Sequence, residues 1–229
     1  MTYISMKFIL KILLLCIFPF TSFSQQDTTD MVKYTPEFKF REGIYLNFSQ
    51  VKSNTPLPKS RIIATLDYDD PNFFDRVLEG KYIYYYDNIG NRNELKSDKI
   101  WGYSRNGFLY IRMDDGYFRI TLIGSVCHFI ASETYYTTQY NSPYYYNSYM
   151  DPYRMYPNTY PTTEMRQYLL DFKNGRVLDY TEESLEVILM QDPELHDEYT
   201  ALSNKKKKQL KFLYMRKYNQ RNPLYFPQN

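Results

Sequence analysis

The sequence predicts an α+β fold, in which a mainly antiparallel β-meander sheet carries two or three C-terminal helices packed on one face. The first observation behind this prediction is a period-two alternation of apolar residues over 98–131, interrupted by dipeptides that favour tight hairpin turns. The second is the region from Thr181 onward, where apolar residues recur at helical spacing after helix-capping residues. A chain of 229 residues is long enough to bury one such core.

The first 24 residues are typical of a secretory signal peptide. Lys7 and Lys11 lie in or beside an apolar run at 8–20, and small residues ending at Ser24 follow it. The run is too short for a comfortable membrane span, and an uncleaved N-terminal anchor is the alternative. We therefore expect 1–24 to be a signal peptide, the protein to be exported to the periplasm or cell envelope, and no stable membrane span to remain after cleavage.

Charge and cysteine content narrow the possible functions. The formal net charge is +2, and both surplus charges, Lys7 and Lys11, lie in the predicted signal peptide, so the rest of the chain is neutral. We therefore expect no nucleic-acid binding. Cys127 is the one cysteine outside that segment, and its strand neighbour His128 points to the opposite face, so the two cannot form a nucleophilic dyad. We identify no catalytic residue, metal site or cofactor in the sequence.

The region before the meander contains short predicted elements. Residues 25–37 are polar and predicted to be a flexible N-terminal segment, and 38–229 to form a single domain. Asp70 and Pro71 are a favourable N-cap and first helical residue, so a helix is expected from there to Gly80. The other predicted elements are strands at 38–48, 61–67 and 81–87, a helical turn at 49–54 and a tight turn at 87–91.

Three two-residue turns, at 106–107, 115–116 and 124–125, set the register of the predicted four-stranded meander. The pairs that they predict are Tyr103 with Tyr110, Trp101 with Arg112, Ile111 with Ile120, Arg112 with Arg119, Leu122 with Cys127, and Thr121 with His128. All three turns agree on one almost wholly apolar face, because neighbouring residues of a strand point to opposite sides. That face comprises Ile100, Leu109, Ile111, Met113, Phe118, Ile120, Leu122, Cys127, Phe129 and Ala131.

The opposite face of the meander combines aromatic and cationic side chains, and it is the candidate ligand site. Trp101 beside Arg112 favours a cation–π contact, and Arg112 opposite Arg119 is repulsive without an anionic neighbour. That neighbour is either a ligand or a carboxylate from the acidic C-terminal helices, if these cover the face. The candidate ligand-binding residues are Trp101, Tyr103, Tyr110, Arg112, Arg119 and His128.

Residues 134–163 are predicted to be a Tyr-rich, low-complexity insertion. Ten Tyr lie between Tyr135 and Tyr160, the insertion holds four Pro, and neither a strand period nor a helix period survives. Three interpretations stay open: a disordered loop, a contact surface for an envelope protein, or an aromatic platform for the sugar rings of a glycan. The candidate partner-binding residues are Tyr135, Tyr136, Tyr144, Tyr145, Tyr146, Tyr149 and Tyr153.

The chain after the insertion is predicted to form a hairpin and then helices. The predicted elements are strands at 165–172 and 176–180 around Asn174-Gly175, a helix capped by Thr181, a helix capped by Asp192, and a helical continuation at 205–218. An acidic block at 179–198 precedes a basic block at 205–221. This order suits the helix dipole, and the two blocks can also pair between helices.

Three stretches of the sequence carry a resemblance to other proteins. They are Lys-Ile-Trp-Gly-Tyr at 99–103, Ile-Gly-Ser-Val-Cys-His-Phe at 123–129, and the ending at 208–219 followed by Asn-Pro-Leu-Tyr at 222–225. Together they resemble uncharacterised exported proteins of Bacteroidetes-type bacteria, over most of the chain apart from the insertion. The resemblance implies an envelope location and no particular activity. Two functions stay open: a non-enzymatic binding module with an aromatic surface, or a hydrolase acting on envelope polymers.

Overall fold

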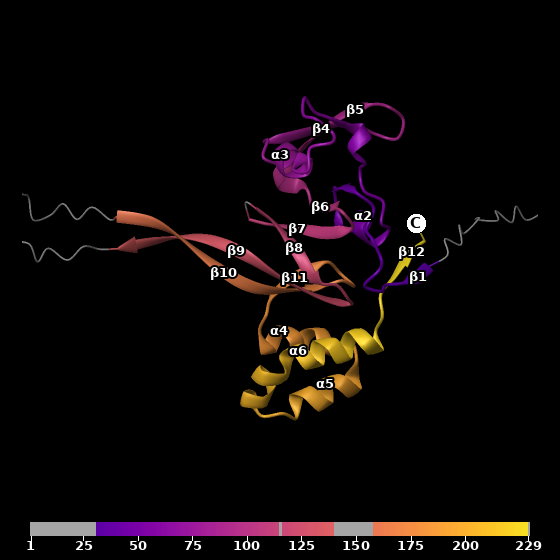
Figure 1. Cartoon of the computed structure of the whole chain (residues 1–229). Helices are drawn as coiled ribbons and strands as arrows, with labels where there is room; N and C mark the ends of the chain where they lie inside the picture. Colours follow the sequence, from indigo (N-terminus) through magenta and orange to yellow (C-terminus); the bar gives the residue numbers. More distant parts are fainter. Residues whose placement is uncertain (1–30, 115, 140–157, 229) are drawn as a thin grey trace, which may run out of the picture. The chain divides into compact units, whose positions relative to one another are not determined.

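The computed structural model describes residues 31–114, 116–139 and 158–228, and the predicted α+β fold is confirmed (Figure 1). The described residues form antiparallel sheets of seven, three and two strands, together with helices that include a C-terminal group of three. None of the described helices is both long and apolar enough to span a membrane.

The seven-stranded sheet has the order β11-β10-β9-β8-β7-β6-β2. Its strands are β2 (Gly43–Tyr45), β6 (Gly102–Arg105), β7 (Phe108–Met113), β8 (Gly116–Leu122), β9 (Val126–Gln139), β10 (Asn158–Asp171) and β11 (Arg176–Asp179). The smaller sheets are β3 (Ile62–Ile63), β4 (Tyr82–Tyr86) and β5 (Arg92–Lys96), and β1 (Met31–Lys33) with β12 (Tyr225–Pro227). The helices are α2 (Phe48–Lys52), α3 (Phe73–Leu78), α4 (Glu182–Leu189), α5 (Pro193–Thr200) and α6 (Asn204–Arg221).

The predicted four-stranded meander is present as β6 to β9, and the predicted turn at 106–107 is confirmed. Asn106 and Gly107 have φ angles of 54° and 79°, the left-handed conformation that a tight hairpin turn requires. Tyr103 accordingly pairs with Tyr110, and the Arg112 N–H donates to the Trp101 carbonyl at 2.9 Å.

The second predicted turn is displaced by one residue. Asp114 takes the left-handed conformation, with φ 45°, and Met113 pairs with Gly116. The cross-strand register therefore slips by two residues, so Arg112 lies opposite Tyr117 and not opposite Arg119. A slip of two leaves every side chain on its predicted face, because strand side chains alternate with a period of two.

Neither pair predicted at the third turn forms. Ile120 pairs with Phe129, which the predicted register implies, but a bulge between Ile120 and Leu122 places Leu122 opposite His128 and not opposite Cys127. The extra residue reverses the side to which the end of β8 points. Leu122 therefore packs with the C-terminal helices and not on the predicted apolar face.

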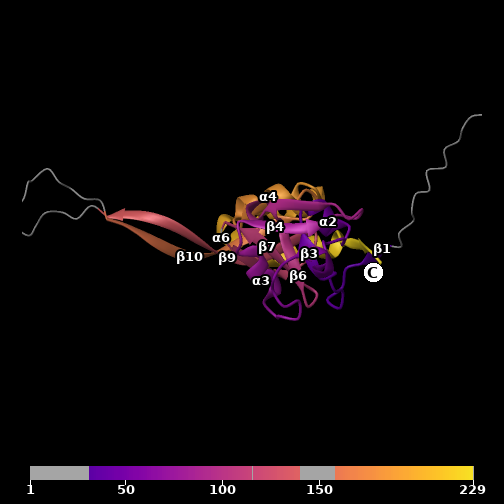
Figure 2. The same cartoon turned by 90° about the horizontal axis from the view of Figure 1, so that it is seen from above.

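The long strands β9 and β10 extend into the region predicted to be a structureless insertion. Residues 134–139 belong to β9 and 158–163 to β10, with paired residues from Thr134–Thr163 to Gln139–Asn158. In Figures 1 and 2 the far ends of β9 and β10 reach beyond the other labelled elements. We call residues 130–139 and 158–167 the ribbon, because here β9 and β10 pair with each other and with no other described strand.

The sheet has separate hydrophobic clusters on its two faces. The sheet cluster, on the predicted apolar face, contains Phe40, Tyr45, Val51, Leu109, Ile111, Ile120, Cys127, Phe129, Ala131, Tyr168, Leu170, Phe172 and Phe226. The helix cluster, on the other face of β9 and β10, contains Val126, Leu169, Leu185, Ile188, Leu189, Leu195, Tyr199, Tyr214, Met215 and Tyr218. The C-terminal helices therefore pack on one face of the sheet, as predicted.

A third cluster joins β6 to the smaller sheet and α3. It contains Ile44, Leu57, Ile62, Phe73, Phe74, Leu78, Ile83, Ile100 and Tyr103, and we call it the N-terminal cluster. Ile100 belongs here and not to the predicted apolar face. The strand β1, within the segment predicted to be flexible, pairs with β12 through Met31–Pro227, Val32–Phe226 and Lys33–Tyr225.

The acidic and basic blocks pair between the C-terminal helices. Thr181 and Asp192 cap α4 and α5 as predicted, each accepting a backbone N–H three residues on. The pairs between the blocks are Glu186–Lys207 at 2.7 Å, Glu182–Lys211 at 3.2 Å, Glu198–Lys217 at 2.6 Å, and Arg221 with both Asp192 and Glu194 at 2.7 Å. The acidic and basic blocks of the sequence therefore form ion pairs with each other within the group of three C-terminal helices.

Candidate functional site

The six predicted ligand-binding residues do not form one site. Trp101 packs on the sheet cluster, with its ring 5.7 Å from that of Phe48. Tyr103 and Tyr110 lie at the N-terminal cluster, where their rings stack 4.7 Å apart. These residues therefore do not share one open aromatic surface, because Trp101 packs on the sheet cluster whereas Tyr103 and Tyr110 lie at the N-terminal cluster.

The carboxylate that contacts Tyr103 comes from α3, and its cationic partner is Arg105 and neither of the two predicted arginines. Asp75 accepts a hydrogen bond from the Tyr103 hydroxyl at 2.5 Å and forms an ion pair with Arg105 at 2.8 Å. Burial, together with the negative charge of Asp75, raises the pKa of Tyr103. This tyrosine is therefore a neutral donor that holds α3 against β6, and its ring is closed to ligands.

The two predicted arginines are separated and partnered by aromatic rings. The Arg112 guanidinium lies 5.8 Å from the centre of the Tyr117 ring and donates to the Ser97 carbonyl at 3.3 Å. The Arg119 guanidinium lies 3.6 Å from the centre of the exposed Phe108 ring. The repulsion predicted between the arginines is relieved by the register slip, so it does not indicate a ligand.

His128 lies at the edge of the helix cluster, away from the other five predicted residues. Its ring is 5.0 Å from that of Tyr180, and its Nε2 shares a 3.0 Å hydrogen bond with Gln167. Cys127 points to the opposite face, as predicted, and burial raises the pKa of its thiol to about 12. A thiol that stays protonated at neutral pH is a poor nucleophile.

The ribbon has one face that is charged and internally bonded. Arg166 lies 2.8 Å from Glu133 and 3.5 Å from Glu164, and it bridges these two directly opposed acids. The Tyr135 hydroxyl donates to Glu164 at 2.6 Å, and this bond raises the pKa of Tyr135. Tyr135, a predicted partner-binding residue, is therefore held among charged neighbours.

The other face of the ribbon carries no charged side chain among the described residues. This uncharged face comprises Ile130, Ser132, Thr134 and Tyr136 of β9, and Pro161, Thr163, Met165 and Gln167 of β10. Tyr136 is 73% exposed, Met165 is 78% exposed and Ile130 is 39% exposed. Tyr136 is a predicted partner-binding residue, whereas the sequence analysis missed Met165 and Ile130. Tyr144, Tyr145, Tyr146, Tyr149 and Tyr153 lie outside the described residues.

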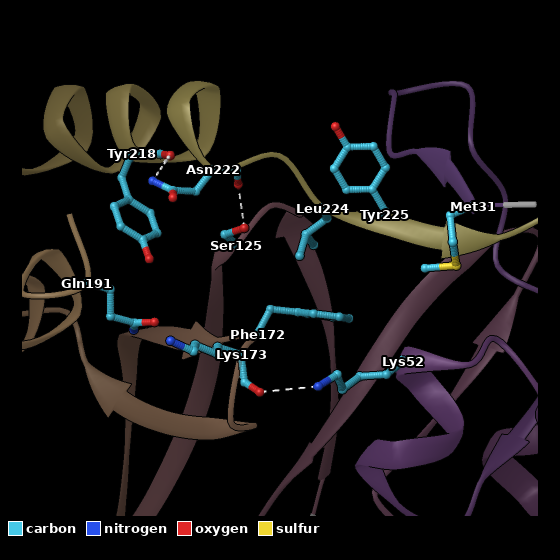
Figure 3. Close-up of a pocket in the computed structure, with 10 residues that line it drawn as sticks. All are labelled: Met31, Lys52, Ser125, Phe172, Lys173, Gln191, Tyr218, Asn222, Leu224 and Tyr225. Atoms are coloured by element: carbon cyan, nitrogen blue, oxygen red, sulfur yellow. Dashed lines mark hydrogen bonds between the residues drawn. The ribbon is translucent and has the colours of Figure 1, made fainter.

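A cavity of about 380 Å³ lies where β12, α2, the end of α6 and the turn between β10 and β11 meet (Figure 3). Phe172 and Leu224 supply apolar surface, and Met31 and Tyr225 lie at the β1–β12 pair. Its polar lining is Lys52, Ser125, Lys173, Gln191, Tyr218 and Asn222. None of these residues was a sequence candidate, because only the folded chain brings these segments together.

Within the described ranges, no group of three or more His, Cys, Asp or Glu side chains is placed to hold a metal ion. No family model, curated protein or solved structure matches the chain. The ribbon and the cavity are the two features from which function can be argued.

Proposed function

We propose that this chain is an exported, non-enzymatic binding protein that engages a protein partner of the cell envelope through the ribbon. The features of the first 24 residues support export, and the uncharged face of the ribbon supports partner binding. The observation that carries the proposal is the exposure of Tyr136 and Met165 on a face that the described domain leaves uncovered.

The ribbon's exposed surface favours contact with a protein. Large side chains that are exposed together on one face are typical of interaction sites. Tyr136 lies directly opposite Pro161, and Met165 directly opposite Ser132, so the exposed groups stand on a regular two-stranded support. Tyr adds contact area at a small loss of side-chain entropy, and Met adapts its shape to a partner.

The ribbon's backbone supports the same function. A two-stranded ribbon leaves the outward N–H and C=O groups of both strands unpaired along its edges, and such edges accept an added strand. Thr and Tyr, which are common in the ribbon, have high β propensity. We propose that the partner adds a strand along one edge while its side chains cover Tyr136 and Met165.

The test compares the two faces of the ribbon. The variant Tyr136→Ser with Met165→Ser alters the uncharged face, and Glu133→Gln with Arg166→Gln is the matched double variant on the charged face. Each full chain, with an affinity tag, is expressed in the cell of origin, and bound proteins are captured from the envelope fraction and quantified by mass spectrometry. We expect the first variant to lose a specific partner at least tenfold and the second to retain it.

Two outcomes contradict the proposal. The first is equal recovery of every captured protein with both variants, when circular dichroism shows that both are folded. This result would show that the uncharged face is not the binding surface. The second is recovery of the tagged chain from the cytoplasm alone, which would show that the protein is not exported.

A further inference from the structure

The cavity beside β12 has a size and a lining that suit a small molecule. Its volume of about 380 Å³ lies toward the lower end of the range of roughly 300–1,000 Å³ that is typical of ligand pockets. Phe172 is buried and Leu224 half-buried, so one side of the cavity presents apolar surface. The lining thus divides into an apolar part and a polar part, as in sites for compact organic molecules.

Two lysines form the cationic part of the lining. Lys52 donates to the Lys173 carbonyl at 3.3 Å, so the end of α2 is tied to the β10–β11 turn. Neither lysine forms an ion pair within 4.0 Å with any residue that the structure describes. Both ammonium groups therefore have donors to spare for a ligand.

Asp171, in the same turn as Lys173, already accepts hydrogen bonds from neutral donors. Asp171 is buried, and it accepts from the Lys173 N–H at 3.0 Å, from the Asn174 amide at 2.8 Å and from the Gln191 amide at 3.2 Å. These bonds hold the carboxylate in the turn. The lysine ammonium groups are thus left to face the cavity and solvent without a bonded counter-ion.

Tyr218 adds a hydroxyl to the polar part. Figure 3 shows this hydroxyl directed from α6 toward the side of the cavity where Gln191 and Lys173 lie. Burial, and then the negative charge of Asp171 and Asp192, raise the pKa of Tyr218. The phenol therefore stays protonated at neutral pH and is available as a donor.

We propose that this cavity binds a small organic carboxylate with a compact apolar body. The positive charges of Lys52 and Lys173 attract the carboxylate, and the Tyr218 hydroxyl donates to it or to a neighbouring oxygen. Phe172 and Leu224 contact the apolar body. Charge-assisted hydrogen bonds from ammonium groups suit a carboxylate, and the apolar wall selects against fully hydrated anions. This site is separate from the ribbon and independent of the function proposed for it.

Calorimetric titration with defined probes tests the proposal. Benzoate and hexanoate are the acid probes, benzamide and hexanamide are the neutral probes of the same shape, and inorganic phosphate is the hydrated anion. We expect each acid to bind at one site per chain, and its amide and phosphate to bind at least tenfold more weakly.

Matched lysine variants locate the binding. Lys52→Gln with Lys173→Gln is expected to weaken benzoate binding at least tenfold, while Lys205→Gln with Lys206→Gln, on the exposed start of α6, leaves it unchanged. Both pairs are exposed, so the variants are expected to fold, and circular dichroism checks this. Tyr218→Phe, which keeps the ring, is expected to weaken binding about threefold to tenfold.

Three results would overturn the proposal. The first is the absence of saturable binding by either acid. The second is equal affinity for benzoate in the Lys52/Lys173 and the Lys205/Lys206 double variants. The third is phosphate binding as tight as benzoate binding, which indicates a surface anion contact without the apolar part of the cavity.

Discussion

The strands β9 and β10 pass through two different environments. Near the turn at 124–125, Cys127 and Leu170 are buried in the sheet cluster, while Val126 and Leu169 are buried in the helix cluster. In the ribbon beyond Ala131 the same ladder continues, but most described side chains on both faces are exposed. Both parts of the ladder share the same backbone hydrogen-bond pattern. Side-chain burial, and not strand pairing, therefore distinguishes the part that stabilises the fold from the ribbon, whose side chains are free to contact a partner.

The largest expected effect comes from breaking the buried part. Phe129→Ala removes a fully buried ring from the sheet cluster and is expected to lower the free energy of unfolding by about 3–5 kcal/mol. Thr137→Ala, on the same strand and the same side but in the ribbon, is expected to change it by less than about 0.5 kcal/mol. Urea unfolding followed by circular dichroism measures both. Equal losses would show that the ribbon is as strongly held as the sheet.

A smaller effect is expected where α6 joins β9. The Asn219 side chain accepts from the Val126 N–H at 2.7 Å and donates to the Val126 carbonyl at 2.8 Å, so it takes the place of a neighbouring strand. Asn219→Ala leaves both groups without this partner, at an expected cost of about 2 kcal/mol. The exposed neighbour Gln220→Ala is the control. Urea unfolding measures both variants. If Asn219→Ala lowers the free energy of unfolding no more than Gln220→Ala does, water takes over the hydrogen bonds of the Asn219 amide.

The smallest expected effect is on the charged face of the ribbon. Arg166→Gln leaves Glu133 and Glu164 directly opposed without their bridging cation. We expect no measurable change in the urea midpoint, because the three side chains are solvated, but faster amide hydrogen exchange in the ribbon than in the native chain. Exchange measured by mass spectrometry, with 126–129 as an internal reference, tests this. A fall in the midpoint with uniform exchange would contradict it.

The parts of the fold that the sequence predicted well are those in which local chemistry and burial agree. Asn106-Gly107 specified its turn, and Thr181 and Asp192 specified helix starts, because each depends on its near neighbours alone. The turn near 115 was ambiguous, because Asp114 can also take a left-handed conformation. The bulge before Leu122 was not predictable, because it depends on how β8 meets β9 and the helices.

The ribbon and the candidate sites were less predictable for physical reasons. Because the side chains at 134–137 are exposed on both faces, this part of β9 needs no apolar alternation, so the pattern that identifies a half-buried strand is missing. Tyr136 was identified by composition, but Met165 and Ile130 gained significance only when pairing placed them on its face. The cavity residues come from segments far apart in the chain, and no local signal joins them.

The pairing of β1 with β12 has a consequence for the order in which the molecule can fold. Phe226 is fully buried in the sheet cluster, and its ring contacts Phe38, Phe40 and Phe172. In the direction of synthesis, β1 and the sheet precede this ring. The sheet cluster therefore stays incomplete until β12 has been synthesised. Contacts between such distant positions are those that slow folding most.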